Sequence, residues 1–515
     1  MTAHITQILA RAAQLYGEAP ALQAFGNESR NWRELYQEVQ LFAGALKNIG
    51  VTANSQVAIM SLNSARYFES LYAIPSVGAR IVPLNIRWAE PELEYALEDS
   101  NSKYLIFDEV FTPLVSKIHD KLDSISHYIY TGSHDSCPQW ALLLDDLIAD
   151  ATPLSELISS EDDLAGIFYT GGTTGFPKGV MLQHDALLNS AVCVAGAVAA
   201  DNNSVVLHSA PMFHLADLTS CFAYTIMGAK HLTVPMFEPK AVMTCLQQHK
   251  ASDLLLVPTM IQLLVEHPEF ENYQFASLRN LLYGASPMPE GLLRRILTDA
   301  PHLNLVQAYG QTEMAPVISL LLDSDHSLED HKKHLLRAAG RPVPTVCLKI
   351  VDENNHSLEA GKIGEICARG PSTMKGYWNK KEETDAALIN GWLHTGDAGY
   401  IDEQGYLFVV DRVKDMIVTG GENVYSAEVE NTISLLPGVI QVAVIGIADS
   451  QWGERVHAVV VTAPGTSYSG DAILEHCKKY IAAYKCPKSF DISAEPLPLS
   501  STGKVLKRAL RDRYQ

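Results

Sequence analysis

Residues 169–180 read YTGGTTGFPKGV, a stretch that combines glycines, threonines and one lysine. Glycine lets the backbone approach a ligand closely, and backbone N–H groups, hydroxyls and an ammonium are donors that bind phosphate. The P-loop of nucleotide-binding proteins requires Gly-Lys-Ser/Thr at its end, where a helix begins. Here Pro177 precedes Lys178, and Gly179 with the apolar residues after it favours entry into a strand. We therefore expect a phosphate-binding loop, but not in the P-loop geometry.

Further polar motifs follow in a fixed order: PMFH at 211–214, YGASP at 283–287, AYGQTE at 308–313, TGD at 395–397, DRVKDMIVTGGENVYSAEVE at 411–430 and STGK at 501–504. AYGQTE follows the apolar run HLNLVQ, so we expect it on a loop at the carboxyl end of a strand, where α/β sheets present ligand-binding groups. Its Glu313 could bind Mg²⁺ through oxygen, and Asp397 could accept both hydroxyls of a ribose. Taken alone, each motif also fits a turn, a core residue or a helix cap.

The elements that would carry these motifs differ between the two parts of the chain. Up to about residue 410, short apolar runs typical of buried strands alternate with longer helical patterns such as 32–50 and 289–299. This alternation predicts an α/β body with layered sheets. Beyond residue 410 the pattern indicates a smaller α+β unit. We expect a large domain over 1–410, a hinge over 411–415 and a small C-terminal domain over 416–515.

The charge is distributed unevenly between these parts. Residues 411–515 hold 12 Lys and Arg and 12 Asp and Glu, so the whole net charge of −20 lies in residues 1–410. The net negative charge disfavours nonspecific binding to nucleic acid, because phosphate neutralisation needs clustered cations. Any anionic ligand must therefore meet local donors.

The composition, with 47% hydrophobic and 19% charged residues, is that of a compact globular protein. The eight cysteines are scattered without a C-x-x-C pair, so we expect neither a zinc site nor a disulfide framework, and a reducing cytoplasm fits best. The first residues lack the pattern of a signal peptide, and the most apolar stretch, 186–200, is too short and too polar to span a bilayer. These features predict a cytoplasmic protein without a transmembrane segment.

The motifs quoted above, in this order and spacing, closely resemble those of the acyl-adenylate-forming superfamily, and specifically its AMP-dependent acyl-CoA synthetases. The resemblance spans about residues 10–510. It implies that a carboxylic acid attacks the α-phosphate of ATP, releasing pyrophosphate, and that the thiol of CoA then takes the acyl group. It also implies Mg²⁺ as a cofactor and a small C-terminal domain that moves between the two steps.

The resemblance places the nucleotide among most of the motifs. Residues 170–178 would close on the β and γ phosphates, with Thr170 and Glu313 near Mg²⁺. Tyr309 would stack on adenine, and Thr312 would hydrogen-bond the α-phosphate or the acyl carboxylate. The expected ATP or AMP contacts are Thr170, Gly171, Gly172, Thr173, Thr174, Gly175, Lys178, Gly284, Ala285, Ser286, Tyr309, Gly310, Thr312, Asp397, Arg412 and Lys504.

The C-terminal motifs would supply the moving parts. Lys504 matches the family lysine that bridges the carboxylate and the α-phosphate, which explains the basic end of the chain better than a solvated helix face does. The expected catalytic residues are Lys504, Thr312, Lys178 and His214. Lys414 falls on the hinge position, and Gly420, Gly421 and Trp452 would contact CoA after the small domain rotates. Trp452 fits simple domain packing equally well.

The acid is expected to bind beside PMFH, where His214 would act as a gate rather than as an acid or base. The predicted acyl pocket is His214, Leu215, Leu218, Gly284 and Ala315. Asp217 could serve a polar substrate or merely face solvent. The apolar residues 316–318 favour a medium or long fatty acid, with an aryl acid of the benzoate or coumarate kind second.

Two other functions compete with a CoA ligase that uses a small-molecule acid, ATP and CoA. An acyl-AMP ligase that loads a carrier protein usually carries an insertion restraining the small domain, and none is evident between 340 and 415. A nucleotide or acyl sensor would be expected to lack Lys504, Glu313 or Asp397, which are all present. A homodimer is compatible with the sequence.

Overall fold

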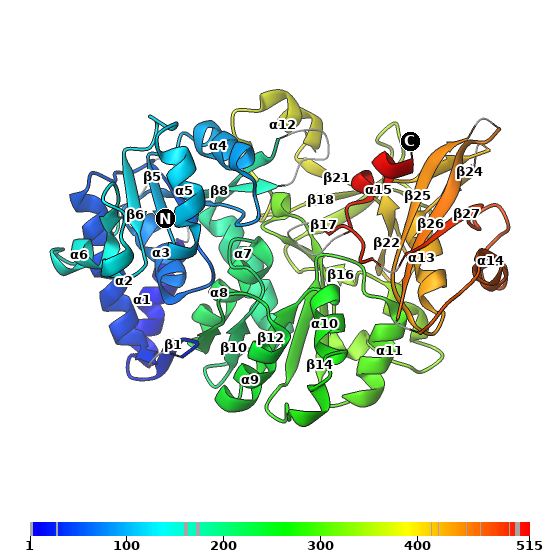
Figure 1. Cartoon of the computed structure of the whole chain (residues 1–515), viewed down its shortest axis with the longest axis horizontal. Coiled ribbons are helices and arrows are strands. Elements are labelled where there is room, and N and C mark those ends of the chain that lie inside the picture. Colours follow the sequence, from blue (N-terminus) through cyan, green and yellow to red (C-terminus); the bar gives the residue numbers. More distant parts are fainter. Residues whose placement is uncertain are drawn as a thin grey trace.

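The computed structural model describes residues 4–26, 29–158, 163–170, 176–413, 415–420, 422–449, 451–463, 465–493, 495–499 and 505–514. Helices and strands alternate along the large domain, which confirms the predicted α/β class (Figure 1). The helices are α1 (Ile5–Tyr16), α2 (Trp32–Asn48), α3 (Ala65–Ser76), α4 (Glu90–Asp99), α5 (Thr112–His119), α6 (Leu144–Ala149), α7 (His184–Ala197), α8 (Leu215–Met227), α9 (Pro239–His249), α10 (Pro258–Val265), α11 (Glu290–Asp299), α12 (Lys381–Ala387), α13 (Ser426–Ser434), α14 (Gly470–Lys478) and α15 (Lys507–Tyr514). Among the described residues, we find no helix whose length and apolar character would let it span a bilayer.

Two mainly parallel sheets form the body. The first has the order β16 (Arg341–Pro342), β15 (Val317–Leu321), β14 (Asn304–Gly310), β13 (Asn280–Gly284), β12 (Asp253–Leu256), β10 (Val205–His208), β11 (Lys230–Thr233), β1 (Pro20–Ala24) and β2 (Arg30–Asn31). The second has the order β19 (Gly376–Tyr377), β9 (Lys178–Gln183), β8 (Leu164–Thr170), β4 (Arg80–Pro83), β3 (Gln56–Met60), β5 (Tyr104–Phe107), β6 (His127–Tyr130) and β7 (Leu142–Leu143).

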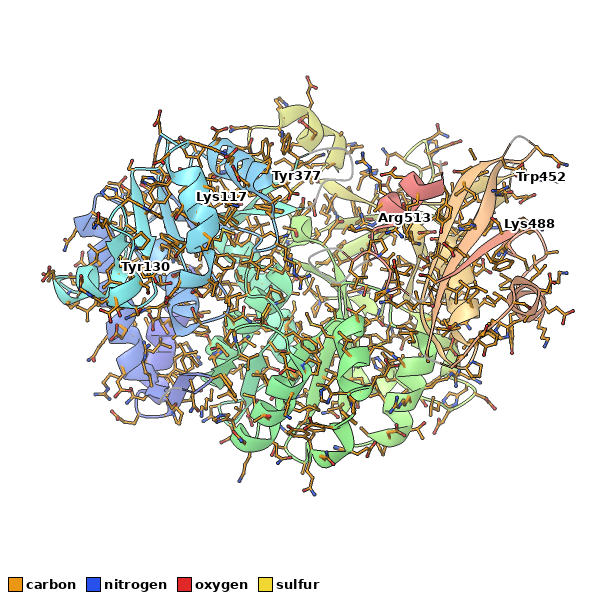
Figure 2. All side chains as sticks on the ribbon, viewed as in Figure 1. Lys117, Tyr130, Tyr377, Trp452, Lys488 and Arg513 are labelled. Carbon is orange, nitrogen blue, oxygen red and sulfur yellow. The ribbon has the colours of Figure 1, made fainter. Side chains whose placement is uncertain are left out.

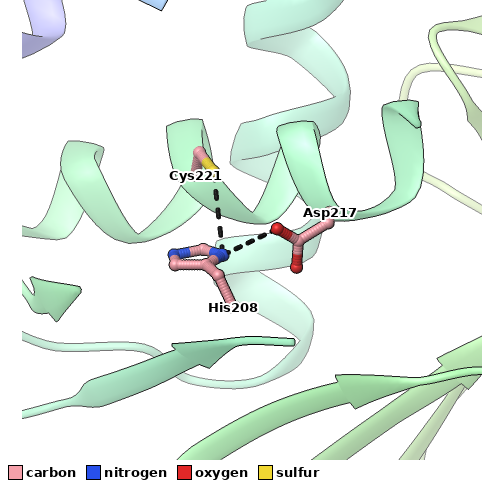
Figure 3. Close-up of side chains that lie close together, drawn as sticks. All are labelled: His208, Asp217 and Cys221. Carbon is pink, nitrogen blue, oxygen red and sulfur yellow. Dashed lines mark hydrogen bonds and ion pairs between the residues drawn. The ribbon is translucent and has the colours of Figure 1, made fainter. Parts of the chain in front are cut away.

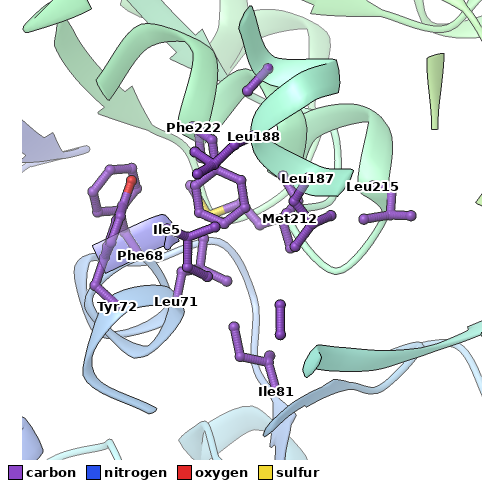
Figure 4. Packing of buried hydrophobic residues seen from close by; sticks show 14 of the residues in the cluster. Ile5, Phe68, Leu71, Tyr72, Ile81, Leu187, Leu188, Met212, Leu215 and Phe222 are labelled. Atoms are coloured by element: carbon purple, nitrogen blue, oxygen red, sulfur yellow. The ribbon is translucent and has the colours of Figure 1, made fainter. Parts of the chain in front are cut away.

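Alternating side chains divide the strands between separate hydrophobic cores. In the first sheet, Val206 and Leu255 enter the central core, whereas Leu207 and Leu254 enter a core with α9, α10 and α11. The second sheet likewise contributes residues to the central core and to a core with α4 and α5. Buried residues of α1, α2, α3, α7 and α8 fill the central core, as Figure 4 shows for Ile5, Phe68, Leu71, Tyr72, Leu187 and Phe222. Because both faces of each sheet are covered, its strands read as continuous apolar runs.

A third sheet completes the body, and a fourth belongs to the C-terminal part of the chain. The third has the order β17 (Cys347–Val351), β18 (Gly364–Arg369), β21 (Trp392–Ile401) and β20 (Leu388–Ile389), with β22 (Leu407–Arg412) on β21. The fourth has the order β24 (Glu422–Val424), β23 (Ile417–Thr419), β26 (Gly453–Thr462) and β25 (Val439–Asp449), with β27 (Ser489–Ser493) on β26. This small α+β unit lies at one end of the molecule (Figure 1).

Candidate active site

The predicted phosphate loop joins two antiparallel strands. Thr170 ends β8 and pairs with Lys178, the first residue of β9, and the Thr170 hydroxyl lies 3.5 Å from the Lys178 carbonyl oxygen. Entry into a strand at Lys178 is therefore confirmed, and the helix of a P-loop is not present there. The predicted contacts Gly171, Gly172, Thr173, Thr174 and Gly175 lie outside the described residues.

Tyr377, which the sequence reasoning missed, joins two of the predicted residues. The Lys178 ammonium lies 5.0 Å from the centre of the Tyr377 ring, and the Tyr377 hydroxyl donates to Glu313 Oε1 at 2.9 Å. Burial and the Glu313 carboxylate raise the pKa of Tyr377 far above its ordinary value, so its hydroxyl keeps its proton. The stretch KGYWN, with its adjacent aromatic residues, was the available signal in the sequence.

A second contact group forms around Asp397, which is 6% exposed. Asp397 on β21 faces Arg412 on β22 in register, and Arg412 Nε lies 2.7 Å from Asp397 Oδ1. The Tyr309 hydroxyl donates to Asp397 Oδ2 at 2.7 Å, and burial together with the Asp397 charge raises the pKa of Tyr309 well above its ordinary value. Three motifs thus meet at one buried carboxylate, and Tyr309 comes from a position 88 residues before Asp397 in the sequence.

Two elements place these residues differently from the sequence expectation. The loop predicted for AYGQTE is only partly right, because β14 continues through Tyr309 to Gly310 and a short 3-10 helix then spans Thr312–Met314. The strand continues because Tyr309 still pairs with Ser319 of β15. Glu365, which was not predicted, accepts from the Gly396 N–H at 3.0 Å, at the register shift between β18 and β21 just before Asp397.

The YGASP motif lies at the carboxyl end of β13 beside β14. A Cβ atom on Gly284 would lie 2.2 Å from the Ala308 carbonyl oxygen, so the close approach of the two strands requires glycine. Ala285 turns the chain with a φ of +65°, and Ser286 follows it half-buried. Gly284 is therefore required for packing between strands, whatever it contacts in a ligand.

Most residues of the predicted acyl pocket lie at the start of α8 and along the turn after β14. His214 precedes the first residue of α8, and its ring centre lies 4.1 Å from that of Phe213. Leu215 and Leu218 of α8 and Ala315 are 5%, 0% and 0% exposed and belong to the central core. The side chains of Leu215, Leu218 and Ala315 are therefore closed to solvent.

Asp217 is fully buried, so the expectation that it could face solvent is wrong. His208 Nδ1 lies 2.9 Å from Asp217 Oδ2, and Cys221 Sγ lies 3.7 Å from the same nitrogen (Figure 3). His208 Nε2 lies 2.9 Å from His231 Nδ1, and burial, with the nearby His208, lowers the pKa of His231 well below its ordinary value. A neutral His231 that donates to His208 lets His208 donate to Asp217, so this hydrogen-bonded chain fixes α8 against the sheet.

Magnesium would fit the oxygen groups at the phosphate end of the site. Glu313 is half-buried, and only its Oε1 receives a hydrogen bond from the described residues, which leaves Oε2 for a cation. Thr170, the other predicted metal contact, ends the strand next to the loop. The clusters His208–Asp217–Cys221 and Glu365–Cys367–His394 are instead tied together by their own hydrogen bonds.

In the small domain, Gly420 and Trp452, which are both predicted to contact CoA, contact each other. The Gly420 N–H donates to the Trp452 carbonyl oxygen at 2.8 Å, and Trp452 is 50% exposed. Figure 2 places Trp452 at the outer edge of the small domain, far from Tyr377. The predicted hinge Lys414, the predicted CoA contact Gly421 and the predicted catalytic residue Lys504 lie outside the described residues.

A cavity of about 550 Å³ beside Arg30 and Glu38 is lined by none of the predicted site residues. Its lining mixes polar and apolar side chains from β1, β2, α2 and the first residue of α3. The candidate site is therefore defined by the two contact groups, around Tyr377 and around Asp397, and not by this cavity.

The layered body, the small C-terminal domain and the clustered motifs define an adenylate-forming enzyme. The model of the AMP-binding enzyme family matches residues 9–378, and that of the AMP-binding enzyme C-terminal domain matches residues 428–504. The chain belongs to this family, within the acyl-adenylate-forming superfamily, and is an AMP-forming acid–thiol ligase. ATP and CoA are substrates of this enzyme family.

The chain is similar to CoA ligases over nearly its whole length. A feruloyl-CoA synthase of Amycolatopsis sp is 36% identical over 505 residues, with 98% of each chain covered. A long-chain-fatty-acid–CoA ligase of Thermus thermophilus is 32% identical over 526 residues, covering 99% of this chain and 96% of the relative. The solved structure of the anthranilate CoA ligase AuaEII with anthranoyl-AMP has a TM-score of 0.91 at 25% identity, covering 100% of this chain and 98% of the other.

Proposed function

We propose that this protein activates a carboxylic acid as its acyl-adenylate at the expense of ATP, releases pyrophosphate and transfers the acyl group to CoA. The observation that carries the proposal is the meeting of motifs that are distant in sequence. One contact group brings together Lys178 and Glu313, and another brings together Tyr309, Asp397 and Arg412. The Lys178 cation suits the phosphate end of a nucleoside triphosphate, and the Asp397 carboxylate suits the hydroxyls of its ribose.

The two contact groups would hold the two ends of ATP during adenylation. Lys178 would hold the β and γ phosphates, and Glu313 with Thr170 would hold Mg²⁺, which neutralises charge between the phosphate groups. At the other end, Asp397 would accept the ribose hydroxyls, with Arg412 and Tyr309 fixing its two oxygens. Holding the nucleotide at both ends orients the α-phosphate toward the attacking carboxylate.

The second step requires the small domain to move. We propose that Lys504 stabilises the charge that develops in adenylation and then withdraws as rotation about Lys414 brings Gly420, Gly421 and Trp452 to the site. The position of Trp452 at the outer edge of the small domain supports this, because a CoA contact there needs rotation to reach the acyl-adenylate (Figure 2).

A compact acid with an aryl body would displace fewer packed side chains of the predicted acyl pocket than a long acyl chain would. Leu218, Ala315 and Ile318 are fully buried in the central core, so a long chain would have to separate close-packed side chains. The relative named feruloyl-CoA synthase and the solved complex with anthranoyl-AMP agree with a compact acid. The fatty acid that the sequence put first is the second candidate, favoured by the Thermus thermophilus relative.

The test is to incubate the protein with ATP, Mg²⁺, one acid and either CoA or an acyl carrier protein, and to weigh the products by mass spectrometry. We expect acyl-CoA and AMP, with a higher kcat/KM for ferulate, anthranilate or indoleacetate than for palmitate. Transfer to the carrier protein alone would identify an acyl-AMP ligase, and ATP binding without any AMP release would identify a sensor.

The eight cysteines are all free thiols, which supports a reducing compartment such as the cytoplasm as the site of action. A homodimer stays a prediction, which the mass of the protein in solution would test.

A further inference from the structure

Tyr377 lies in a segment that is bonded to two ATP motifs at once. Its strand, β19, pairs with β9, and the Trp378 N–H donates to the Gly179 carbonyl oxygen at 2.7 Å. Just before this strand, the Met374 N–H donates to the Glu313 carbonyl oxygen at 2.8 Å. The backbone on either side of Tyr377 is therefore fixed both to the strand that follows the phosphate loop and to the AYGQTE motif.

The Tyr377 side chain contacts two opposite charges through different parts of itself. Its ring lies 5.0 Å from the Lys178 ammonium, while its hydroxyl donates to the Glu313 carboxylate at 2.9 Å. The hydroxyl is the donor in this hydrogen bond, because an ionised carboxylate can only accept. One rigid aromatic side chain thus sets the separation between the cation and the carboxylate.

This arrangement leaves both charges available to a ligand. Within the described parts of the chain, neither Lys178 nor Glu313 forms an ion pair. An aromatic ring attracts a cation without cancelling its charge, and a neutral hydroxyl leaves a carboxylate negative. A direct Lys178–Glu313 ion pair would instead neutralise the two groups that a triphosphate and a divalent cation need.

We propose that Tyr377 is a positioning residue that holds Lys178 and Glu313 near each other but keeps them from pairing, so that one binds phosphate and the other Mg²⁺. This role rests on the proposed function. The hydroxyl acts through Glu313 on the metal, and the ring acts through Lys178 on the phosphates. The two halves of the side chain can therefore be removed separately.

The test is calorimetric titration of the full-length protein with ATP, at varied Mg²⁺ and in EDTA. Tyr377→Phe keeps the ring and loses the hydroxyl, so we expect the Mg²⁺ concentration for half-maximal ATP binding to rise about tenfold while ATP affinity in EDTA stays unchanged. Tyr377→Leu loses both parts, so Lys178 is free to pair with Glu313, and ATP affinity in EDTA should fall about tenfold as well.

Tyr406 offers a matched control. Its ring centre lies 4.1 Å from the Arg341 guanidinium and its hydroxyl donates to Asp325 at 2.8 Å, so it makes the same two kinds of contact away from the ATP motifs. Tyr406→Phe should leave both titrations unchanged. Thermal unfolding of each variant separates lost binding from lost folding.

Three results would overturn the proposal. The first is a Tyr377→Phe variant with the wild-type Mg²⁺ midpoint, and the second is equal ATP affinity of the Phe and Leu variants in EDTA. If either result is obtained while the wild type binds ATP and releases AMP, the role of Tyr377 is rejected and the proposed function stands. The third, a wild type that binds no ATP, would reject the proposed function together with the role of Tyr377.

Discussion

Lys507 is a partly buried cation whose removal should weaken the small domain. Its ammonium lies 2.7 Å from Glu430 Oε1 and donates to the Ser426 hydroxyl, and the two charged side chains are only 17% and 19% exposed. Burial works against the charged ammonium, but Glu430, Asp411 and Asp415 outweigh it and raise the pKa of Lys507 above its ordinary value. Lys507 is therefore charged at neutral pH and ties α15 to α13.

The substitution Lys507→Met keeps the aliphatic stem and removes the charge. Breaking a buried ion pair costs about 3–5 kcal/mol when one charge is left unpaired. Here water reaches part of both side chains, and Glu430 Oε1 still accepts from the Val444 N–H at 2.7 Å. We therefore expect a loss of about 2–3 kcal/mol in the stability of the small domain.

Hydrogen exchange measured by mass spectrometry would report this loss locally. The Val444 amide lies in β25, so peptides covering Val439–Asp449 should exchange about 30- to 150-fold faster in Lys507→Met. Lys240→Met is the control, because Lys240 pairs with Glu269 at 2.9 Å with 54% and 42% of the side chains exposed, and should cost below about 1 kcal/mol. If Lys507→Met changes exchange in β25 by less than twofold, the ion pair does not stabilise the domain.

Three further outcomes are expected. Thermal stability should fall as the pH drops from 6.5 toward 4, because burial lowers the pKa of His4 to about 4, and burial together with the nearby His4 lowers the pKa of His184 to about 2. In this pH range the unfolded chain binds protons at these histidines that the folded chain does not bind. Above pH 6.5 both imidazoles are neutral in the folded and in the unfolded state. Gly284→Ala should cost about 3 kcal/mol in urea unfolding, since the new Cβ would lie 2.2 Å from the Ala308 carbonyl oxygen. Asp397→Asn should weaken AMP binding in calorimetry by about tenfold or more, because a carboxylate accepts stronger hydrogen bonds from ribose hydroxyls than an amide does.

Each of these outcomes has a control or a contradicting result. The acid-dependent loss should shrink in His4→Gln/His184→Gln, and an unchanged pH slope in that variant would assign the loss to other groups. A methyl group on Gly196 of α7 would meet nothing within 4 Å, so Gly196→Ala should not destabilise the protein, and equal effects at both glycines would contradict the packing argument. Unchanged AMP affinity in Asp397→Asn would show that the ribose does not bind at Asp397.

The sequence allowed the fold class to be predicted because local patterns carry most of it. Apolar runs such as residues 253–256 and 280–284 are strands buried on both faces, and their alternation with helical patterns indicated the layered body. The motif order likewise assigned Tyr309, Asp397 and Arg412 to one expected nucleotide, and these three side chains contact one another.

Contacts that depend on tertiary packing could not be predicted. Nothing in the spacing of Tyr377 showed that its ring and hydroxyl would reach two motifs, because β19 pairs with β9 across almost 200 residues of sequence. Asp217 can be buried because it is hydrogen-bonded to His208, which is hydrogen-bonded in turn to His231 on the neighbouring strand. The sequence pattern does not show that these side chains meet. Both cases concern polar groups, whose partners periodicity does not reveal.

The central claim is that the protein forms an acyl-adenylate in one arrangement and a thioester in another. The most direct measurement is acid-dependent exchange of labelled pyrophosphate into ATP by the wild type and by Lys504→Ala, beside thioester formation from supplied acyl-adenylate and CoA. We predict that the wild type performs both steps and that Lys504→Ala loses exchange by several orders of magnitude while still forming the thioester. No exchange with any acid, or equal loss of both steps in the variant, would contradict the account.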